Sequence, residues 1–142
     1  METQELYRGR LIDHLQLVVR DLEASRGFYQ ALFDVLGIPL GGEGENYFWV
    51  DELFVSSADN ENASGQLTGR VHLAFQARDQ AMVDAAYKAG LDAGGRDNGA
   101  PGERTYHPGY YAAFLLDPDG NNIEAVYHGP HDRSAEAVKI TF

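Results

Sequence analysis

An internal repeat constrains the fold of this chain more than any other feature of its sequence. Residues 14–21 read HLQLVVRD and residues 72–79 read HLAFQARD, so four of eight positions are identical at a spacing of 58 residues. Each copy begins with the alternation typical of a half-buried strand and ends with an Asp, a favoured helix N-cap. Each is followed by an apolar helical stretch that ends at a glycine, Gly37 or Gly90. The repeat therefore predicts a protein built twice from one unit.

Each copy is expected to form a strand, a helix and three further strands. In the first copy the expected elements lie at 11–19, 22–36, 38–40, 46–50 and 53–57. In the second copy we expect a strand at 71–76, a helix at 80–89, a long glycine-rich loop at 92–109, and hairpin strands at 110–116 and 121–127 around the turn DPDG. Neither half has enough apolar surface to fold alone, so the two sheets are expected to pair.

The ends and the middle of the chain are expected to carry less structure. The segment 58–67 is polar, without periodicity, and is interpreted as a surface linker. Residues 129–136 are interpreted as an exposed connector, and 137–142 as a last short strand. A length of 142 residues fits one compact domain.

Charge and composition exclude several classes of function. The formal net charge of -11 disfavours a nucleic-acid partner, because an acidic surface repels phosphates. No segment approaches the roughly 20 apolar residues of a membrane span, and the polar N-terminus is unlike a secretory signal. The absence of cysteine excludes disulfides and thiolate metal sites, and it is compatible with a cytoplasmic location.

Three polar residues are candidates for one concave sheet surface. Alternation places His14 and His72 on the face opposite the richer apolar face of their strands, and it separates Glu124 from Ile123. Two imidazoles and one carboxylate form the ligand set of divalent metal sites with open positions. A lone strand histidine is more often a hydrogen-bonded side chain, but recurrence in both copies of a repeat favours the metal interpretation.

The sequence resembles the vicinal oxygen chelate superfamily, which includes glyoxalase I, extradiol dioxygenases, fosfomycin-resistance thiol transferases and bleomycin-binding proteins. The segments that carry the resemblance are IDHLQLVV, DLEASRGFYQALFDVLG, VHLAF and, most specifically, FLLDPDGNNIEAV, at residues 12–19, 21–37, 71–75 and 114–126. The resemblance implies an α+β fold of two βαβββ modules that pair into a cupped mixed sheet. It also implies a divalent metal (Fe, Mn, Zn or Ni) held by His14, His72 and Glu124.

The boundaries follow from this resemblance. One domain is expected at 10–129, with a first module at about 10–57, the linker at 58–67, a second module at about 68–128, and a C-terminal extension at 130–142. Exposed strand edges and a half-open cup also suggest a homodimer.

Two departures from the family pattern bear on the reaction. Glyoxalase I-like members take a fourth ligand from the last strand of the first module, but that strand here is LFVSS, and the nearest acid, Glu52, is interpreted as a solvated turn residue. The dioxygenase pattern has a histidine and then a tyrosine before the turn. His107 is at the histidine position, but Phe114 is at the tyrosine position. His107 is the candidate for proton transfer, or else a loop residue before a proline.

The remaining candidates are substrate-contacting residues. Arg104 is a candidate for binding an anionic substrate, and the other candidates are Gln16, Trp49, Tyr110 and Tyr111. His128 and His131 are interpreted as exposed. We expect a metal-dependent enzyme acting on a small oxygen-bearing organic substrate, dioxygenase-like or thiol-transferase-like in preference to glyoxalase I. The alternative is a bleomycin-resistance-like binding protein without catalysis.

Overall fold

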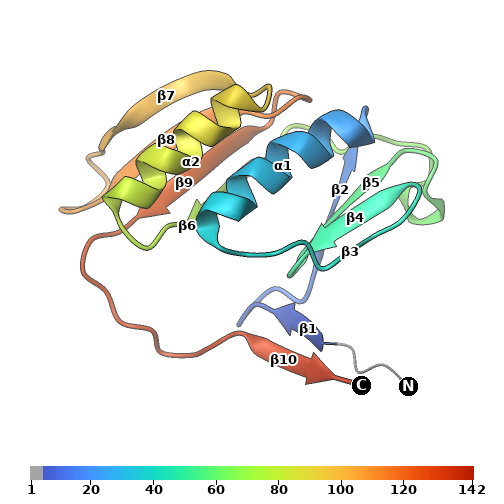
Figure 1. The fold of residues 1–142 in the computed structure, drawn as a ribbon, viewed down its shortest axis with the longest axis horizontal. Helices are drawn as coiled ribbons and strands as arrows, with labels where there is room; N and C mark the ends of the chain where they lie inside the picture. Colours follow the sequence, from blue (N-terminus) through green and yellow to red (C-terminus); the bar gives the residue numbers. More distant parts are fainter. Residues whose placement is uncertain (1–4) are drawn as a thin grey trace. The chain divides into compact units, whose positions relative to one another are not determined.

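The structure is a computed structural model that describes residues 5–142, apart from the side chain of Asn62. It contains two compact units (Figure 1). The first unit consists of residues up to 22, residues 39–67 and residues 132–142, and the second consists of residues 23–38 and 68–131. Each unit is considered separately below.

Each unit contains one four-stranded sheet, and the two sheets have the same strand order. The first sheet has the order β2-β5-β4-β3, from β2 (Leu15–Val19), β3 (Gly42–Glu43), β4 (Tyr47–Val50) and β5 (Leu53–Ser57). The second has the order β6-β9-β8-β7, from β6 (His72–Gln76), β7 (Arg96–Glu103), β8 (Tyr111–Leu116) and β9 (Asn122–Tyr127). In both sheets the first strand pairs parallel with the last. The predicted order of strand, helix and three strands is therefore observed in both copies. In the first copy one strand was misplaced, because residues 38–40 form no strand and β3 lies in the glycine-rich segment that follows them.

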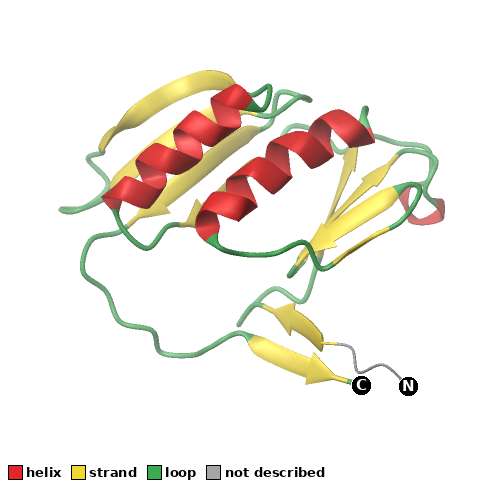
Figure 2. Ribbon diagram, viewed as in Figure 1, coloured by secondary structure: helices red, strands yellow, loops and turns green. Residues whose placement is uncertain are grey.

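Both helices contribute to the second unit (Figure 2). Helix α1 (Leu22–Leu36) has the predicted bounds, and Gly37 follows it with a φ of +78°, the left-handed conformation of a helix terminus. Within this unit the Phe33 ring meets the Phe75 ring of β6 edge to face at 5.0 Å. The Tyr29 hydroxyl donates to Asp117 in the β8–β9 turn at 2.5 Å. The helix that follows the first strand therefore packs on the second sheet.

Helix α2 (Gln80–Asp92) begins as predicted but is longer than predicted. Its N-cap is Asp79, whose carboxylate accepts from the Met82 backbone N–H at 2.8 Å. The helix does not end at Gly90, which is buried inside it. A Cβ on Gly90 would lie 2.3 Å from a Leu115 methyl carbon, so this glycine permits close packing on β8.

The predicted loop at 92–109 is wrong over most of its length, because β7 occupies Arg96–Glu103. This strand pairs with β8 through two register shifts, one between Asp97 and Gly99 and one between Gly99 and Gly102. Bulges of this kind remove the alternation by which a strand is recognised in sequence. Glycine and proline content alone therefore suggested a loop.

The two ends of the described chain pair with each other. The predicted last strand is confirmed as β10 (Val138–Thr141), and its antiparallel partner is β1 (Glu5–Arg8), which was not predicted. The strand predicted at 11–19 is shorter than expected, since β2 begins at Leu15 and Leu11 is 89% exposed. In the linker, a short 3-10 helix covers Glu61–Ala63. Within residues 5–142, neither helix has the length and apolar character that crossing a membrane requires.

Candidate functional site

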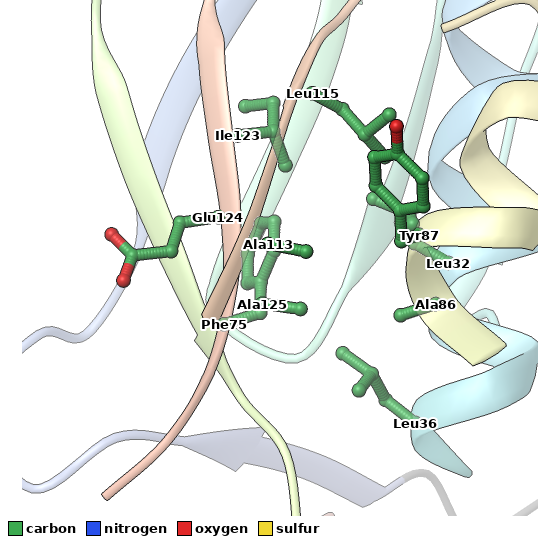
Figure 3. A pocket seen from close by; sticks show the side chains of 10 residues that line it. All are labelled: Leu32, Leu36, Phe75, Ala86, Tyr87, Ala113, Leu115, Ile123, Glu124 and Ala125. Carbon is green, nitrogen blue, oxygen red and sulfur yellow. The ribbon is translucent and has the colours of Figure 1, made fainter. Parts of the chain in front are cut away.

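The second sheet has an apolar face under the helices and a polar face on the other side. In Figure 3, Ile123 and Ala125 of β9 point toward the helices, and Glu124 points the opposite way. This division confirms the alternation predicted for β9. On β6, His72 is exposed and Leu73 is half-buried, as predicted.

Glu124 is at the centre of the polar face. It is only 2% exposed, and each of its carboxylate oxygens has a partner. His72 Nε2 donates to Oε1 at 2.8 Å, and the Tyr110 hydroxyl donates to Oε2. The His72 side chain is 52% exposed, so this imidazole lies between the buried carboxylate and solvent. A buried carboxylate with two donors is a preorganised anionic centre.

The neighbours of this carboxylate in the sheet are alanines and one phenylalanine. Across β6, β9 and β8, Ala74, Glu124 and Phe114 lie side by side, and Gly99 of β7 is opposite Phe114. Alternation places Ala112, which is fully buried, between Tyr110 and Phe114 on the same face. This small residue leaves room for the Tyr110 ring to extend toward Glu124.

Tyr110 is held as a neutral hydrogen-bond donor. Burial is the main cause that raises the pKa of Tyr110 to about 12, and the hydrogen bond to Glu124 is the second. The phenol therefore keeps its proton at neutral pH and continues to donate to the carboxylate. Tyr110 was predicted as a substrate contact, and its bond to Glu124 was not predicted.

A pair of histidines lies next to Tyr110. His107 Nε2 and His128 Nδ1 are 2.8 Å apart, and their ring planes are nearly parallel, with centroids 5.1 Å apart. Both rings meet the Tyr110 ring edge to face. His128 is exposed, as predicted, but its contact with His107 was missed. The signal was available, because His128 follows Glu124 by four positions and alternation continued past β9 places both on one face.

Arg104 lies on the same side of the sheet as Phe114. Its guanidinium carbon is 5.3 Å from the centroid of the Phe114 ring, which in turn lies 5.9 Å from the His72 ring. Arg104 Nη2 donates to the Ala100 carbonyl at 2.8 Å. The cation is thus held over an aromatic ring beside the His72–Glu124 pair, in keeping with an anion-binding role.

Tyr111 is not at this site, contrary to the prediction. Its hydroxyl donates to Asp84 of α2 at 2.7 Å, on the helix-facing side of the sheet. Adjacent residues in a strand point to opposite faces, so Tyr110 and Tyr111 could not both face the carboxylate.

Three predicted site residues belong to the first unit, where each has its own partners. His14 Nδ1 donates to Asp13 at 2.6 Å, and this hydrogen bond is the main cause that lowers the pKa of Asp13. Gln16 donates to the Ser56 hydroxyl at 2.9 Å. Trp49 lies against the glycines that precede and begin β3, and the Arg8 guanidinium is 6.0 Å from its ring centroid.

The sheet registers identify the first-sheet position that corresponds to Glu124. Gln16 and Ala74 are matched in the sequence repeat, and their partners on the neighbouring strand are Phe54 and Glu124. Phe54 therefore occupies the position equivalent to Glu124, and its ring stacks on Tyr47 at 5.3 Å. The first sheet has no carboxylate at this position.

A small cavity lies on the other face of the second sheet. It has room for about one water molecule, approximately 10 Å³, and its walls are almost entirely apolar. Its walls include Leu32, Leu36, Ala86 and Leu115 (Figure 3). Because the Glu124 carboxylate points away from these helices, the cavity is a packing defect and not the polar site.

The predicted metal ligands are brought together only in part. His72 and Glu124 are adjacent, and His14 belongs to the other unit. In the part of the chain that the structure describes, no three His, Asp or Glu side chains are grouped as a metal centre would require. His72 and Glu124 themselves fit as ligands of a divalent metal, because the His72 nitrogen and the Glu124 oxygen are 2.8 Å apart, close to the spacing of neighbouring ligands.

The fold and this site define a class of protein, and comparison with known proteins agrees. The sequence model of the Glyoxalase/Bleomycin resistance protein/Dioxygenase superfamily matches residues 11–125. The chain belongs to this superfamily.

Individual relatives are similar over most of the chain. The uncharacterized protein PA2024 of Pseudomonas aeruginosa is 29% identical over 137 residues, which cover 91% of this chain and 96% of that protein. A glyoxalase/bleomycin resistance protein from Albidiferax ferrireducens has a crystal structure that is 32% identical, with a TM-score of 0.67 over 82% of this chain and 97% of that one. A glyoxalase-related enzyme from Fulvimarina pelagi is 22% identical, with a TM-score of 0.66 over 82% and 87% of the two chains, and shares the fold.

Proposed function

We propose that this chain is a metal-dependent enzyme that acts on a small, oxygen-bearing organic substrate. The observation that carries the proposal is the buried carboxylate of Glu124, with the His72 imidazole on one oxygen and the Tyr110 phenol on the other. Such a carboxylate needs a cation or several donors to offset its burial. The proposed ligands are His14, His72 and Glu124.

The tautomer of His14 supports this ligand set, and that of His72 would have to change. His14 donates from Nδ1 to the Asp13 carboxylate, which leaves Nε2 with a lone pair. A carboxylate behind a histidine is the usual outer partner of a metal ligand. His72 instead places its Nε2 proton on Glu124, so metal binding at this nitrogen would require that proton to move to Nδ1 or to leave.

The metal would polarise the substrate oxygens that it binds. The protein side chains would supply the remaining interactions. Arg104 would attract an anionic substrate, Phe114 would provide a flat apolar wall, and Tyr110 would keep the carboxylate oriented. Phe54, at the position equivalent to Glu124, provides no fourth ligand. We favour dioxygenase-like or thiol-transferase-like chemistry over glyoxalase I chemistry because the proposed site has three protein ligands and no fourth.

Metal content tests the proposal directly. Protein purified without chelators should contain close to one divalent transition metal per chain by elemental analysis. His14→Ala, His72→Ala and Glu124→Ala should each lose most of it. Gln76→Ala, on the same face of β6 as His72, is the matched control and should keep the metal. Wild-type metal content in the His72 and Glu124 variants would remove the assignment.

The reaction type needs a separate assay. Oxygen uptake with a panel of catechols, thiol addition to epoxides, and hemithioacetal isomerisation should be measured side by side on metal-loaded protein. Activity in either of the first two assays supports our ranking. Strong lactoylglutathione formation by an Fe- or Ni-loaded wild type would reverse it.

A bleomycin-resistance-like binding protein remains the second candidate. The half-buried aromatic residues Trp49 and Phe54 of the first sheet favour it, because aromatic side chains bind flat drug-like ligands. Tight binding of a small aromatic ligand by metal-free protein, unchanged in Glu124→Ala, would support this second function.

A further inference from the structure

The His107–His128 pair is the strongest feature that the proposed metal site does not use. His107 Nε2 and His128 Nδ1 are 2.8 Å apart, and the two ring planes differ by 13°. The second nitrogen of His107, Nδ1, is 2.8 Å from the Pro108 carbonyl oxygen. Three consecutive groups are therefore joined by two hydrogen bonds.

The chemistry of these groups determines where the protons are. A carbonyl oxygen can only accept, so His107 Nδ1 carries a proton and donates to Pro108. A neutral imidazole has one N–H, so His107 Nε2 carries the lone pair and accepts from His128 Nδ1. His128 is therefore the Nδ1–H tautomer as well, and its Nε2 has the one uncommitted lone pair of the two rings.

Backbone geometry holds the pair in place. The His107 carbonyl accepts from the Tyr110 N–H at 3.2 Å, and Pro108 and Gly109 are the central residues of this turn. Gly109 has a φ of +89°, as the third residue of a type II turn requires. A Cβ on Gly109 would lie 3.2 Å from the His128 carbonyl oxygen, so glycine also allows the two segments to approach.

One side chain connects this pair to the carboxylate. The Tyr110 ring meets His107 at 5.4 Å and His128 at 5.1 Å, edge to face in both cases. The hydroxyl of the same ring donates to Glu124. The uncommitted nitrogen therefore belongs to a cluster that is continuous with the proposed site.

We propose that His128 is the proton-accepting residue of this site and that His107 is its positioning residue; this inference rests on the proposed function. A substrate O–H or C–H proton moves to His128 Nε2 and leaves its electron pair on the substrate. The imidazolium can pass its Nδ1 proton to His107 Nε2, where Pro108 stabilises the N–H on the far side of the ring. The role that the sequence suggested for His107 is thus moved to His128.

Long-range 1H–15N NMR of the full-length, metal-free protein tests this arrangement without an activity assay. At a pH where both rings are neutral, His107 and His128 should both be Nδ1–H tautomers. His107→Phe keeps an aromatic ring at this position but removes the acceptor, and it should release His128 toward the Nε2–H form. His131→Phe is the control, because His131 donates to the Gly129 carbonyl and not to the pair.

Chemical reactivity gives a second test. Diethyl pyrocarbonate attacks the lone pair of a neutral imidazole, and both rings are solvent-exposed. Peptide mapping by mass spectrometry should show His128 reacting several-fold faster than His107. In His128→Phe, Nε2 of His107 loses its hydrogen bond, and His107 should be modified several-fold faster.

The outcomes separate the two proposals. An Nε2–H tautomer at His128 in the wild type, or faster modification of His107 than of His128, would overturn the roles proposed for the two histidines. Absence of bound metal would instead overturn the proposed function. The NMR and modification measurements on metal-free protein would still test the tautomers of His107 and His128.

Discussion

The two four-stranded sheets share a strand order and a parallel first-to-last pairing, but their matched positions differ in chemistry. The second sheet has Glu124 where the first has Phe54, and it has Phe114 where the first has Trp49. Each sheet retains the histidine of its repeat, at or just before its first strand. One backbone design thus carries a polar centre in one copy and an aromatic surface in the other.

The difference shows which positions the fold needs and which it leaves free. Residues that face the helices in the second sheet are apolar or small, as packing requires. The opposite face carries no such requirement, so equivalent positions on it can hold a carboxylate or a phenyl ring. On this face the first sheet carries stacked aromatic side chains, and the second carries a carboxylate with its two hydrogen-bond donors.

The largest expected effect comes from making the second sheet resemble the first. Loss of a residue that only hydrogen-bonds to a metal ligand lowers metal affinity by roughly 10–100-fold. Glu124→Phe removes a proposed ligand itself and should lower the affinity by at least as much. The reason is that the only carboxylate among the proposed ligands is removed. Phe54→Leu is the matched change in the first sheet and should leave metal content unchanged. Equal metal loss in both variants, with folding checked by circular dichroism, would break the comparison.

The turns that join the last two strands of each sheet should differ in their effect on stability. Asp117 is 1% exposed and accepts from Tyr29, from two backbone N–H groups and from the Asn121 side chain. Asp117→Asn places an amide donor against these donors and should cost about 2–4 kcal/mol of unfolding free energy.

Asp51 is the matched position in the first sheet. It has a φ of +46°, which asparagine also tolerates, and it is partly exposed. Asp51→Asn should therefore change stability by less than about 0.5 kcal/mol. Urea unfolding of the two variants measures the difference, and a similar loss in both would show that the turns are equivalent.

Self-association should depend on the first unit more than on the second. Most of the exposed large apolar side chains belong to the first unit, including Leu11, Ile12, Val138, Ile140 and Phe142. Contiguous exposed apolar side chains are typical of protein interfaces. We predict a homodimer, and Ile140→Lys should weaken it by about tenfold, the scale of 1.4 kcal/mol.

Leu91→Lys, which changes an exposed apolar residue of the second unit, is the control and should not affect association. Sedimentation equilibrium measures both variants. A monomeric wild type at micromolar concentration would rule out the dimer.

The smallest expected effect is a pH dependence of opposite sign in the two units. Burial is the main cause that raises the pKa of Glu52 above 4.5. The folded state therefore binds this proton more tightly, and stability falls as the pH rises from the unfolded pKa through the folded one. Glu52→Gln should raise the melting temperature at pH 7 by about 1 °C, after allowance for solvent screening, and have no benefit below pH 4 or so.

Asp97 should behave in the opposite way. The Gly99 backbone N–H and then the Tyr87 hydroxyl lower the pKa of Asp97. Its contribution to stability is therefore present above the unfolded pKa and is lost as the pH falls through the folded one. Asp97→Ala should lower the melting temperature at pH 7 and not at acidic pH. Melting curves of both variants from pH 3 to 7 show whether the two pH dependences have opposite signs.

Local sequence determined most of the elements and the faces of their strands. The repeat predicted strand, helix and three strands in each copy, the bounds of α1 were predicted correctly, and the Asp79 cap of α2 was predicted from its residue type. Alternation also placed Glu124 and His72 on the face away from the helices. These features depend on residues a few positions apart, which is the range over which backbone periodicity acts.

Long-range packing determined the rest. Only the tertiary structure shows that α1 packs on the second sheet, that bulged 96–103 is a strand, and that β1 pairs with β10. It also brings His128 to His107, and the Tyr110 hydroxyl to Glu124. These contacts join residues that are 8 to more than 100 positions apart, and no local pattern encodes which distant partner a side chain will meet.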